Sequence, residues 1–136
     1  MLVKKLLAAG AVAGSLLAAG LATAAPASAA PAYDCTSGQV CLYYNSAAYG
    51  YGAVYVQTGP VSDYAGKTFQ AGRNGGSGAG VAVKNHAASV DSWVNSTFTV
   101  YYNSGYDCSV ACQSFGSFAT GDLNASVKNN NASGRW

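Results

Sequence analysis

The stretch VCLYYNS at residues 40–46 returns as TVYYNS at residues 99–104. A second matching pair follows in the same order, VKNHAAS at residues 83–89 and VKNNNAS at residues 127–133. Each half therefore opens on an aromatic strand and closes on an Asn/Ser turn, which indicates two copies of one four-stranded unit. Such units pack naturally as two Greek keys facing each other over one core.

Short runs rich in Tyr, Val, Phe and Thr surround these repeats, and no helical apolar period is sustained after the N-terminal region. The runs predicted as strands are residues 40–44, 53–57, 80–84, 90–94 and 97–102, with further candidates at 115–118 and 125–128. Turn residues separate them at 45–46, 58–60 and 103–105. The pattern predicts an all-β fold, a small sandwich or barrel.

Residues 71–80 hold five glycines. A phosphate-binding loop would need a following helix together with a lysine and a hydroxyl, and this pattern is missing. The segment is therefore interpreted as a flexible surface loop or a linker between the two halves.

The four cysteines, Cys35, Cys41, Cys108 and Cys112, form an even set. In an exported chain they indicate two disulfides, with three possible connectivities. We favour Cys35–Cys41 and Cys108–Cys112, each closing a short loop worth about 2 kcal/mol. A four-cysteine zinc site needs close pairs such as C-x2-C, and the spacings here are C-x5-C and C-x3-C.

Residues 1–29 predict a secretory signal peptide. Lys4 and Lys5 precede an Ala/Leu/Gly run over residues 6–25, and a small-x-small cleavage signature follows at residues 27–29. The alternative is a membrane anchor, because the apolar run is close to the length that spans a bilayer. Its alanine and glycine content and the cleavage signature argue against an anchor. We expect a secreted, extracellular domain over residues 30–136 that has no membrane association after cleavage.

Charge is balanced once the signal peptide is removed. Of seven basic residues, Lys4 and Lys5 lie in the leader, so five remain against five aspartates. A net charge near zero provides none of the concentrated positive surface that phosphate backbones require. Nucleic acid is therefore not expected as a partner.

The residue types give little support for catalysis. The chain has a single histidine, His86, and no glutamate. A triad of His86, Asp91 and a serine lacks the spacing of a nucleophile elbow. The scattered aspartates show no grouping that favours glycoside hydrolysis. We therefore expect a protein that is not an enzyme and has no cofactor.

Several motifs together resemble a known family. They are the cysteine-led start at residues 35–44, YGYG at 49–52, ASVDSWVN at 88–95, YYN at 101–103 and the closing Asn-Ala-Ser turn. On these motifs the chain resembles the Streptomyces metalloproteinase inhibitor family, a branch of the βγ-crystallin-like proteins. The resemblance implies a βγ-crystallin-like fold of two Greek keys and, for some members, inhibition of secreted metalloproteinases.

The second half departs from the family pattern after its aromatic run, where two cysteines stand in place of a glycine. Cys108, Ser109, Val110, Ala111 and Cys112 form the candidate inhibitory loop. The resemblance implies a thermolysin-like partner with a hydrophobic pocket on the leaving-group side of the scissile bond, and Val110 is the expected anchor in it. A clamped loop has little ordering entropy left to lose on binding. The alternative is that the disulfide only staples the loop. A monomer is expected.

Many βγ-crystallin units bind calcium through a turn of Asn/Asp residues followed by Ser/Thr. The turn at residues 85–90 lacks two of these positions, and the turn at residues 129–134 lacks only the last serine. The remaining calcium candidates are Asn129, Asn130 and Ser133. No carboxylate lies in either turn, so the attraction for a dication is weak and no metal is expected.

Two other functions remain open without inhibitory activity. One is a cell-envelope or carbohydrate-binding module, for which exposed tyrosines and Trp136 offer stacking faces. The other is an antimicrobial βγ-crystallin-like protein.

Overall fold

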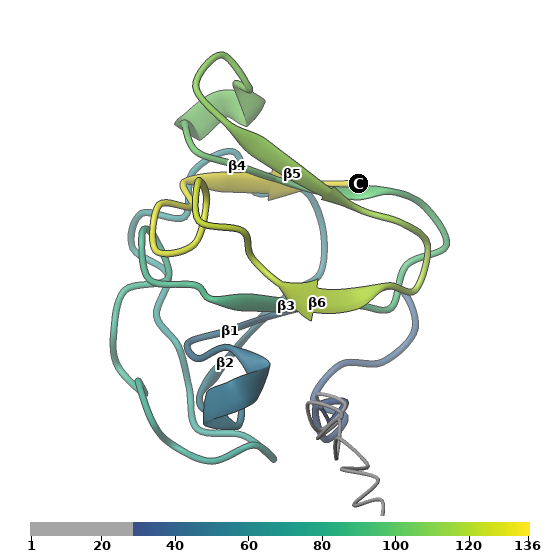
Figure 1. Ribbon diagram of the computed structural model, residues 1–136, viewed down its shortest axis with the longest axis vertical. Helices are drawn as coiled ribbons and strands as arrows, with labels where there is room; N and C mark the ends of the chain where they lie inside the picture. The colour runs from purple at the N-terminus through teal and green to yellow at the C-terminus, as the bar shows by residue number, and fades with distance from the viewer. Residues whose placement is uncertain (1–28) are drawn as a thin grey trace, which may run out of the picture.

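Two antiparallel sheets face each other in the part of the chain that the computed structural model describes, residues 29–136 (Figure 1). Residues 1–28 of the expected signal peptide lie outside the described residues. The elements are β1 (Val40–Tyr43), η1 (Ala47–Tyr49), β2 (Val54–Gln57), β3 (Ser89–Ser92), β4 (Phe98–Tyr101), η2 (Ser104–Tyr106), β5 (Cys112–Phe115), β6 (Thr120–Asp122) and β7 (Ser133–Arg135). The strand orders are β2-β1-β3-β6 and β5-β4-β7. Between residues 29 and 136 no helix has the length and apolar character to cross a membrane.

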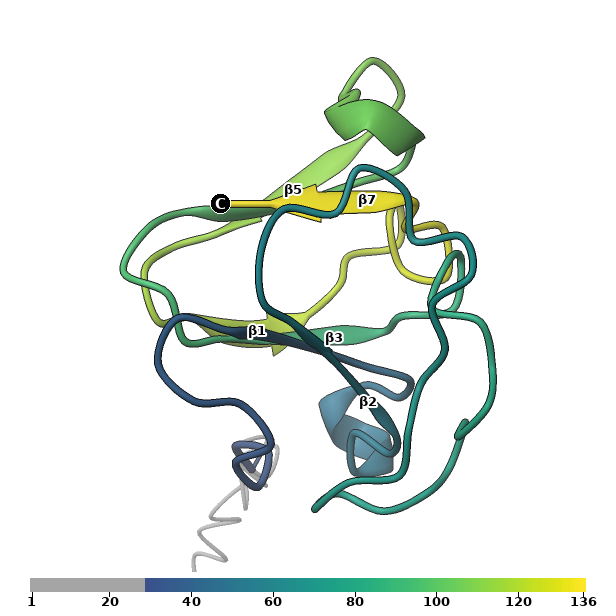
Figure 2. The same cartoon turned by 180° about the vertical axis from the view of Figure 1, so that it is seen from behind.

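Each half contributes its third strand to the sheet of the other half. From the second half, β6 pairs with β3 of the first. In return, Val61 from the first half bridges Gly134 of β7 through two backbone hydrogen bonds of 2.9 and 3.0 Å. Figure 2 shows the chain after β2 rising from one sheet to lie beside β7 in the other. This exchange interlocks two Greek keys, as the sequence repeat predicts.

The repeat is also visible in matching side-chain hydrogen bonds. The Ser89 hydroxyl donates to the Asn45 carbonyl at 2.7 Å. At the corresponding place in the second half, the Ser133 hydroxyl donates to the Asn103 carbonyl at 2.6 Å. In both halves the serine that begins the last strand therefore ties down the hairpin that follows the first strand.

One core fills the space between the sheets. Its largest fully buried side chains include Tyr64, Phe69, Phe98 and Leu42. The phenol of Tyr64 and the amide of Gln57 inside it are paired, whereas the buried Ser92 hydroxyl has no partner among the described residues. The Tyr64 hydroxyl donates to Gln57 Oε1 at 2.6 Å, and Gln57 Nε2 donates to the Gly134 carbonyl at 2.8 Å. These bonds remove the penalty of burying the phenol and the amide without partners.

Three of the predicted strands are wrong. Residues 80–84 form turns and one isolated bridge, residues 115–118 overlap β5 only at Phe115, and residues 125–128 form a turn. The true final strands, β6 and β7, read TGD and SGR. Glycine at their centres gives them no apolar signal. At Gly134 glycine is also required, because a Cβ there would overlap the Tyr64 hydroxyl and crowd the Phe98 ring.

The glycine-rich segment at residues 71–80 does not link the two halves, because it lies between β2 and β3 within the first half. It packs against the β1–β2 hairpin. The Ser77 carbonyl accepts a hydrogen bond from the Ala53 N–H at 2.8 Å. Gly78 has a φ of 88°, and a Cβ there would overlap the ring of Tyr44. The glycines let this segment lie directly on the hairpin as a cover.

We expect the protein to lose stability in alkaline solution. Burial raises the pKa of Tyr64, and burial together with the carboxylate of Asp34 raises the pKa of Tyr43. A phenol in the unfolded chain ionises near pH 10. The stability from these two groups is therefore complete below pH 10 and falls above it, by up to about 1.4 kcal/mol per pH unit for each phenol.

Urea unfolding between pH 8 and 11 measures this fall, and phenolate absorbance reports the ionisation. The Tyr64→Phe variant should show a shallower decline because it removes one of the two groups. A free energy of unfolding that stays level through pH 11 would contradict the prediction.

Candidate functional site

The two favoured disulfides both form, and together they use all four cysteines of the described chain. Cys35 and Cys41 join with a Cα–Cα distance of 5.8 Å, and Cys108 and Cys112 join at 5.1 Å. The first ties the entry segment to β1. The second closes the hairpin loop between β4 and β5, which contains Cys108, Ser109, Val110 and Ala111 of the candidate inhibitory loop, while Cys112 begins β5.

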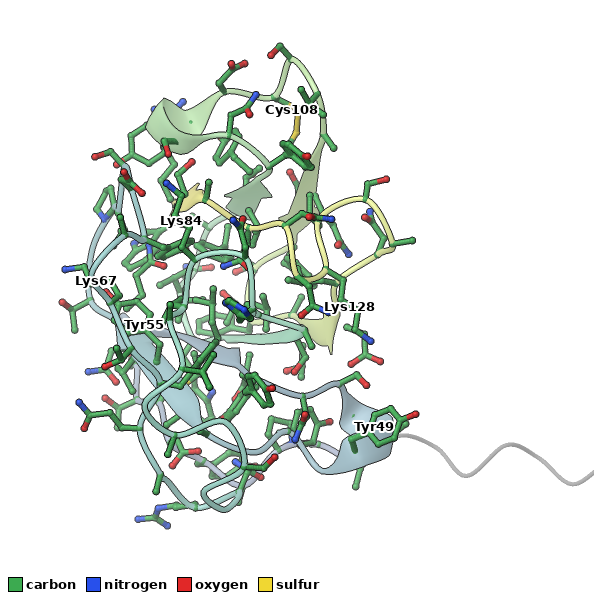
Figure 3. The ribbon with its side chains drawn as sticks, turned by 90° about the vertical axis from the view of Figure 1, so that its left-hand side faces the viewer. Tyr49, Tyr55, Lys67, Lys84, Cys108 and Lys128 are labelled. Atoms are coloured by element: carbon green, nitrogen blue, oxygen red, sulfur yellow. A yellow bond between two sulfur atoms is a disulfide. The ribbon has the colours of Figure 1, made fainter. Side chains whose placement is uncertain are left out.

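This loop projects from one end of the molecule, beyond the two sheets (Figure 1, top). Cys108 marks its position in Figure 3. Val110 lies between the two cysteines with 63% of its surface exposed, which is high for an apolar side chain held in a closed loop. Ser109 is also exposed, whereas Ala111 and Cys112 are half-buried where the loop joins β5.

A polar network holds the backbone just before Val110. Asp107 Oδ1 accepts a hydrogen bond from the Ser109 N–H at 2.8 Å, and Asp107 Oδ2 accepts one from the Ser109 hydroxyl at 3.0 Å. Asn103 Nδ2 donates to the same carboxylate at 3.3 Å. The bonds from Ser109 hold the pKa of Asp107 below its usual range. The loop is thus fixed by a charged hydrogen-bond acceptor as well as by its disulfide.

The base of the loop is anchored on β7. The Tyr106 N–H donates to the Ser133 hydroxyl at 3.1 Å. The guanidinium carbon of Arg135 lies 4.5 Å from the centre of the Tyr106 ring, within the range of a cation–π interaction. Sequence reasoning gives no role to Asp107, Tyr106 or Arg135, and it uses Asn103 only as a residue of the repeat and its turn. Asp-x-Ser at residues 107–109 is nevertheless a recognisable turn signal.

The β1–β2 hairpin provides an internal comparison for the loop. The Tyr44 N–H donates to the Ala53 carbonyl, and the Tyr102 N–H donates to the Ala111 carbonyl, both at 3.0 Å. These corresponding bonds close the two hairpin loops at the same place. The residue just before the second acceptor is Val110, and its counterpart in the first half is therefore Gly52.

The two positions differ in what covers them. A Cβ on Gly52 would lie 2.7 Å from the Ser77 carbonyl of the glycine-rich segment. The second half has only residues 123–132 between β6 and β7, and so it lacks such a cover. Val110 consequently faces solvent, whereas the matching position of the first half is buried.

The calcium candidates lie at the second Asn/Ser turn. Ser133 is buried, and its hydroxyl donates to the Asn103 carbonyl and accepts from the Tyr106 N–H. It is therefore occupied, while Asn129 is exposed and Asn130 half-buried. In residues 29–136, no three His, Cys, Asp or Glu side chains gather in a way that could hold a metal ion.

The His86 and Asp91 side chains have separate structural partners. The His86 Nδ1–H donates to the Lys84 carbonyl at 2.9 Å. Asp91 is buried and accepts hydrogen bonds from Trp93 Nε1 at 2.8 Å and from the Thr120 hydroxyl at 2.6 Å. The two side chains line different clefts of the surface, so the structure does not assemble them into a triad.

Asn131 is a structural residue that the sequence patterns do not reveal. It is fully buried; its Oδ1 accepts from the Ala87 N–H and its Nδ2 donates to the Val83 carbonyl, both at 3.0 Å. The first half has Ala87 at the matching place of the repeat. One amide therefore joins the closing turns of the two halves.

Comparison with solved structures supports the fold. The chain is similar to a structure from work on the evolution of the eye lens beta-gamma-crystallin domain fold, with a TM-score of 0.57 and 13% identity over 78% of this chain and 91% of that one. No protein-family model and no curated protein sequence matches the chain. The described chain thus has a βγ-crystallin-like fold of two Greek keys with two disulfides.

Proposed function

We propose that the protein is a secreted inhibitor of extracellular metallopeptidases, and that the loop from Cys108 to Cys112 occupies the cleft of a thermolysin-like enzyme. The observation that carries this proposal is the exposure of Val110 on a loop fixed at both ends. The resemblance of the sequence to the Streptomyces metalloproteinase inhibitor family supports the same partner.

The loop is suited to bind in the manner of a substrate. The Ser109 backbone is already held by Asp107, so binding orders few additional bonds. Burying the valine side chain in a hydrophobic pocket contributes about 1.5–3 kcal/mol. If the Ser109–Val110 bond is cut, the disulfide keeps both ends together, which slows release of the cleaved loop.

An assay of the protein purified from the culture medium of a secreting host tests the proposal. The panel should contain secreted metalloproteases and secreted serine proteases. We expect stoichiometric inhibition of thermolysin-like metalloproteases and none of the serine proteases. Absence of inhibition across the whole panel would refute the proposed function.

Removing the loop disulfide should weaken inhibition without unfolding the protein. In the Cys108→Ser/Cys112→Ser variant the loop regains conformational freedom, so we expect the inhibition constant to rise about tenfold or more and cleavage at Val110 to become faster. The matched control is Cys35→Ser/Cys41→Ser. It should lower the free energy of unfolding by about 2 kcal/mol and leave the inhibition constant unchanged. Equal inhibition by the two variants would show that the clamp has no functional role.

A second candidate function, binding of cell-envelope polysaccharide, is favoured by one specific observation. Tyr33, Trp93 and Phe118 line a cleft of about 270 Å³. The rings of Tyr33 and Trp93 lie 5.0 Å apart, and Phe118 is well exposed. Trp136 is less suited to stacking, because it is half-buried and packs against the core.

A pull-down on chitin, cellulose and peptidoglycan tests this second function. Retention that is lost in the Phe118→Ala variant would support it. Retention on none of the three polymers would refute polysaccharide binding as a function.

A further inference from the structure

A cleft of about 270 Å³ lies on the outer face of the sheet that contains β1, β3 and β6. The entry segment, residues 29–39, passes over this face, and Figure 2 shows it on the side of the sheet that is remote from the second sheet. Three aromatic side chains line the cleft: Tyr33 of the entry segment, Trp93 directly after β3, and Phe118 before β6. The buried residue Asp91 lies among them, and no basic residue of the described chain lines the cleft.

The position of Asp91 follows from the pairing of the strands. Side chains alternate between the two faces of a strand, and its neighbour Val90 lies in the core, so Asp91 points to the outer face. Cys41 of β1 and Thr120 of β6 are its partners in register on either side. Asp91 is only 5% exposed. Its carboxylate accepts hydrogen bonds from Trp93 Nε1 at 2.8 Å and from the Thr120 hydroxyl at 2.6 Å.

The carboxylate of Asp91 is buried without a cation beside it. Both of its donors, an indole N–H and a hydroxyl, are neutral. Within residues 29–136, Asp91 forms no ion pair. Burying a charge is costly unless the charge is both hydrogen-bonded and paired. A cation is therefore the partner that this cleft lacks.

The aromatic rings around the carboxylate form walls. The ring centres of Tyr33 and Trp93 lie 5.0 Å apart and their planes meet at 77°, so the two rings make a corner and not a flat platform. Phe118 is 57% exposed and has a φ of 54°, a region that bulky residues rarely adopt. The faces of aromatic rings carry partial negative charge and attract cations.

The entry segment is fixed on both sides of Tyr33, counting the residues that follow it and a distant loop. Cys35, two residues later, is bonded to Cys41 of β1. The carboxylate of Asp34 accepts a hydrogen bond from Asn74 Nδ2 at 2.9 Å, which ties the segment to the glycine-rich loop. The corner is thus built before any ligand arrives, which lowers the ordering cost of binding.

We propose that this cleft binds a small organic cation, a quaternary ammonium group, with its charge beside Asp91 and its methyl groups against the rings of Trp93 and Phe118. A quaternary ammonium group has no N–H, so it needs the charge of the carboxylate and no free acceptor position. The cleft does not include the Cys108–Cys112 loop, so the proposal is independent of protease inhibition. A neutral polysaccharide in the same cleft would leave the charge of Asp91 unpaired.

Choline is a suitable probe. Its neutral counterpart is the alcohol dimethylbutanol, in which a carbon atom replaces the nitrogen. Binding to the full secreted protein can be followed by the NMR signal of the Trp93 indole N–H. We expect a saturable shift with choline, and an affinity for the alcohol that is about tenfold weaker or lower still. Equal affinity for the two probes, or shifts confined to other regions, would overturn the proposal.

Two other occupants of the cleft give distinct results. Retention on a polysaccharide, together with no binding of choline, would support the polysaccharide and refute the cation site. Ala30 and Pro31 also line the cleft. Choline binding that is seen only after acetylation of the α-amino group would mean that the processed N-terminus fills the cleft, which would refute a site open to ligands.

Phe118→Leu should weaken choline binding by about threefold or more, because leucine keeps an apolar side chain and removes the ring. Tyr49→Leu is the matched control, since Tyr49 is an exposed aromatic residue that lines a different cleft. It should leave the affinity unchanged. Because Phe118 and Tyr49 are both on the surface, these two variants should keep the thermal unfolding temperature.

Asp91→Asn should weaken choline binding by about tenfold or more and leave the affinity for the neutral alcohol unchanged, because it removes the charge and keeps an acceptor oxygen. If this variant is too unstable to measure, Phe118→Leu still tests the site. Unchanged choline affinity in either variant would refute the assignment, whether or not the protein inhibits a protease.

Discussion

Replacing Gly134 with alanine is expected to lower the free energy of unfolding by about 3 kcal/mol, in the upper range for overpacking a core. Gly134 lies in β7, where Val61 crosses from the other half. A Cβ at this position would overlap the Tyr64 hydroxyl and lie 2.9 Å from Phe98 Cζ. Both side chains are fully buried, so neither has room to move away.

Hydrogen bonds around Gly134 raise the energetic cost of moving Tyr64 away from an added Cβ. The Tyr64 hydroxyl donates to Gln57, and Gln57 donates to the Gly134 carbonyl, so a displaced Tyr64 would leave buried polar groups unpaired. Gly116→Ala is the matched control, because a Cβ there meets no atom within 4 Å. Urea unfolding of the two variants measures the difference. A Gly134→Ala variant as stable as the control would mean that the two sheets do not meet as described.

Replacing Val110 with aspartate should abolish inhibition, raising the inhibition constant at least about a hundredfold. The substitution removes the apolar burial and brings an unpaired carboxylate into a hydrophobic pocket. Val110 makes little contact with the rest of the protein, so the free energy of unfolding should hardly change. Titration of a thermolysin-like metalloprotease with wild type and variant gives the two constants.

Two further variants separate the effect of losing the apolar side chain at position 110 from the effect of adding a negative charge to the protein. Val110→Leu keeps an apolar side chain and should inhibit within about tenfold of wild type. Thr58→Asp adds the same charge at an exposed position in another loop and should inhibit as wild type does. Inhibition by Val110→Asp at the wild-type level would show that another surface engages the protease.

The fold could be predicted from the sequence where the signal is local and duplicated. The aromatic starts of the two halves predict β1 and β4 to within a residue at either end, because alternating tyrosines and valines suit a half-buried strand. Both cysteine pairs are close in sequence, and their pairing follows the shortest loops. The repeat alone then leads to two Greek keys.

Strands β6 and β7 could not be predicted in the same way. The central glycine of each strand, Gly121 or Gly134, gives no apolar signal, and Gly134 is required by the Tyr64 and Phe98 side chains, which arrive from distant parts of the chain. Propensity scales count glycine against a strand, whereas tertiary packing requires it at position 134. The cover over Gly52 is also long-range, because Ser77 reaches it from the glycine-rich segment.

The sequence predicts that the candidate loop is a ring of five residues closed by a disulfide. It does not predict that Val110 is exposed on this loop. The exposure of Val110 depends on the absence of a covering segment in the second half, which only the folded comparison with Gly52 reveals. The ion pair between Lys84 and Asp63 is hidden for the same reason. Asp63 lies 21 residues before its partner Lys84 in sequence, and the strand exchange brings them together.

Mass spectrometry of the protein recovered from an equimolar complex with a thermolysin-like metalloprotease tests the central claim most directly. If the clamped loop lies across the catalytic cleft, the protein will be recovered intact or with a single cut between Ser109 and Val110, its two parts still joined by Cys108–Cys112. Recovery of a complex in which that bond is untouched and the chain is cut elsewhere would contradict the account.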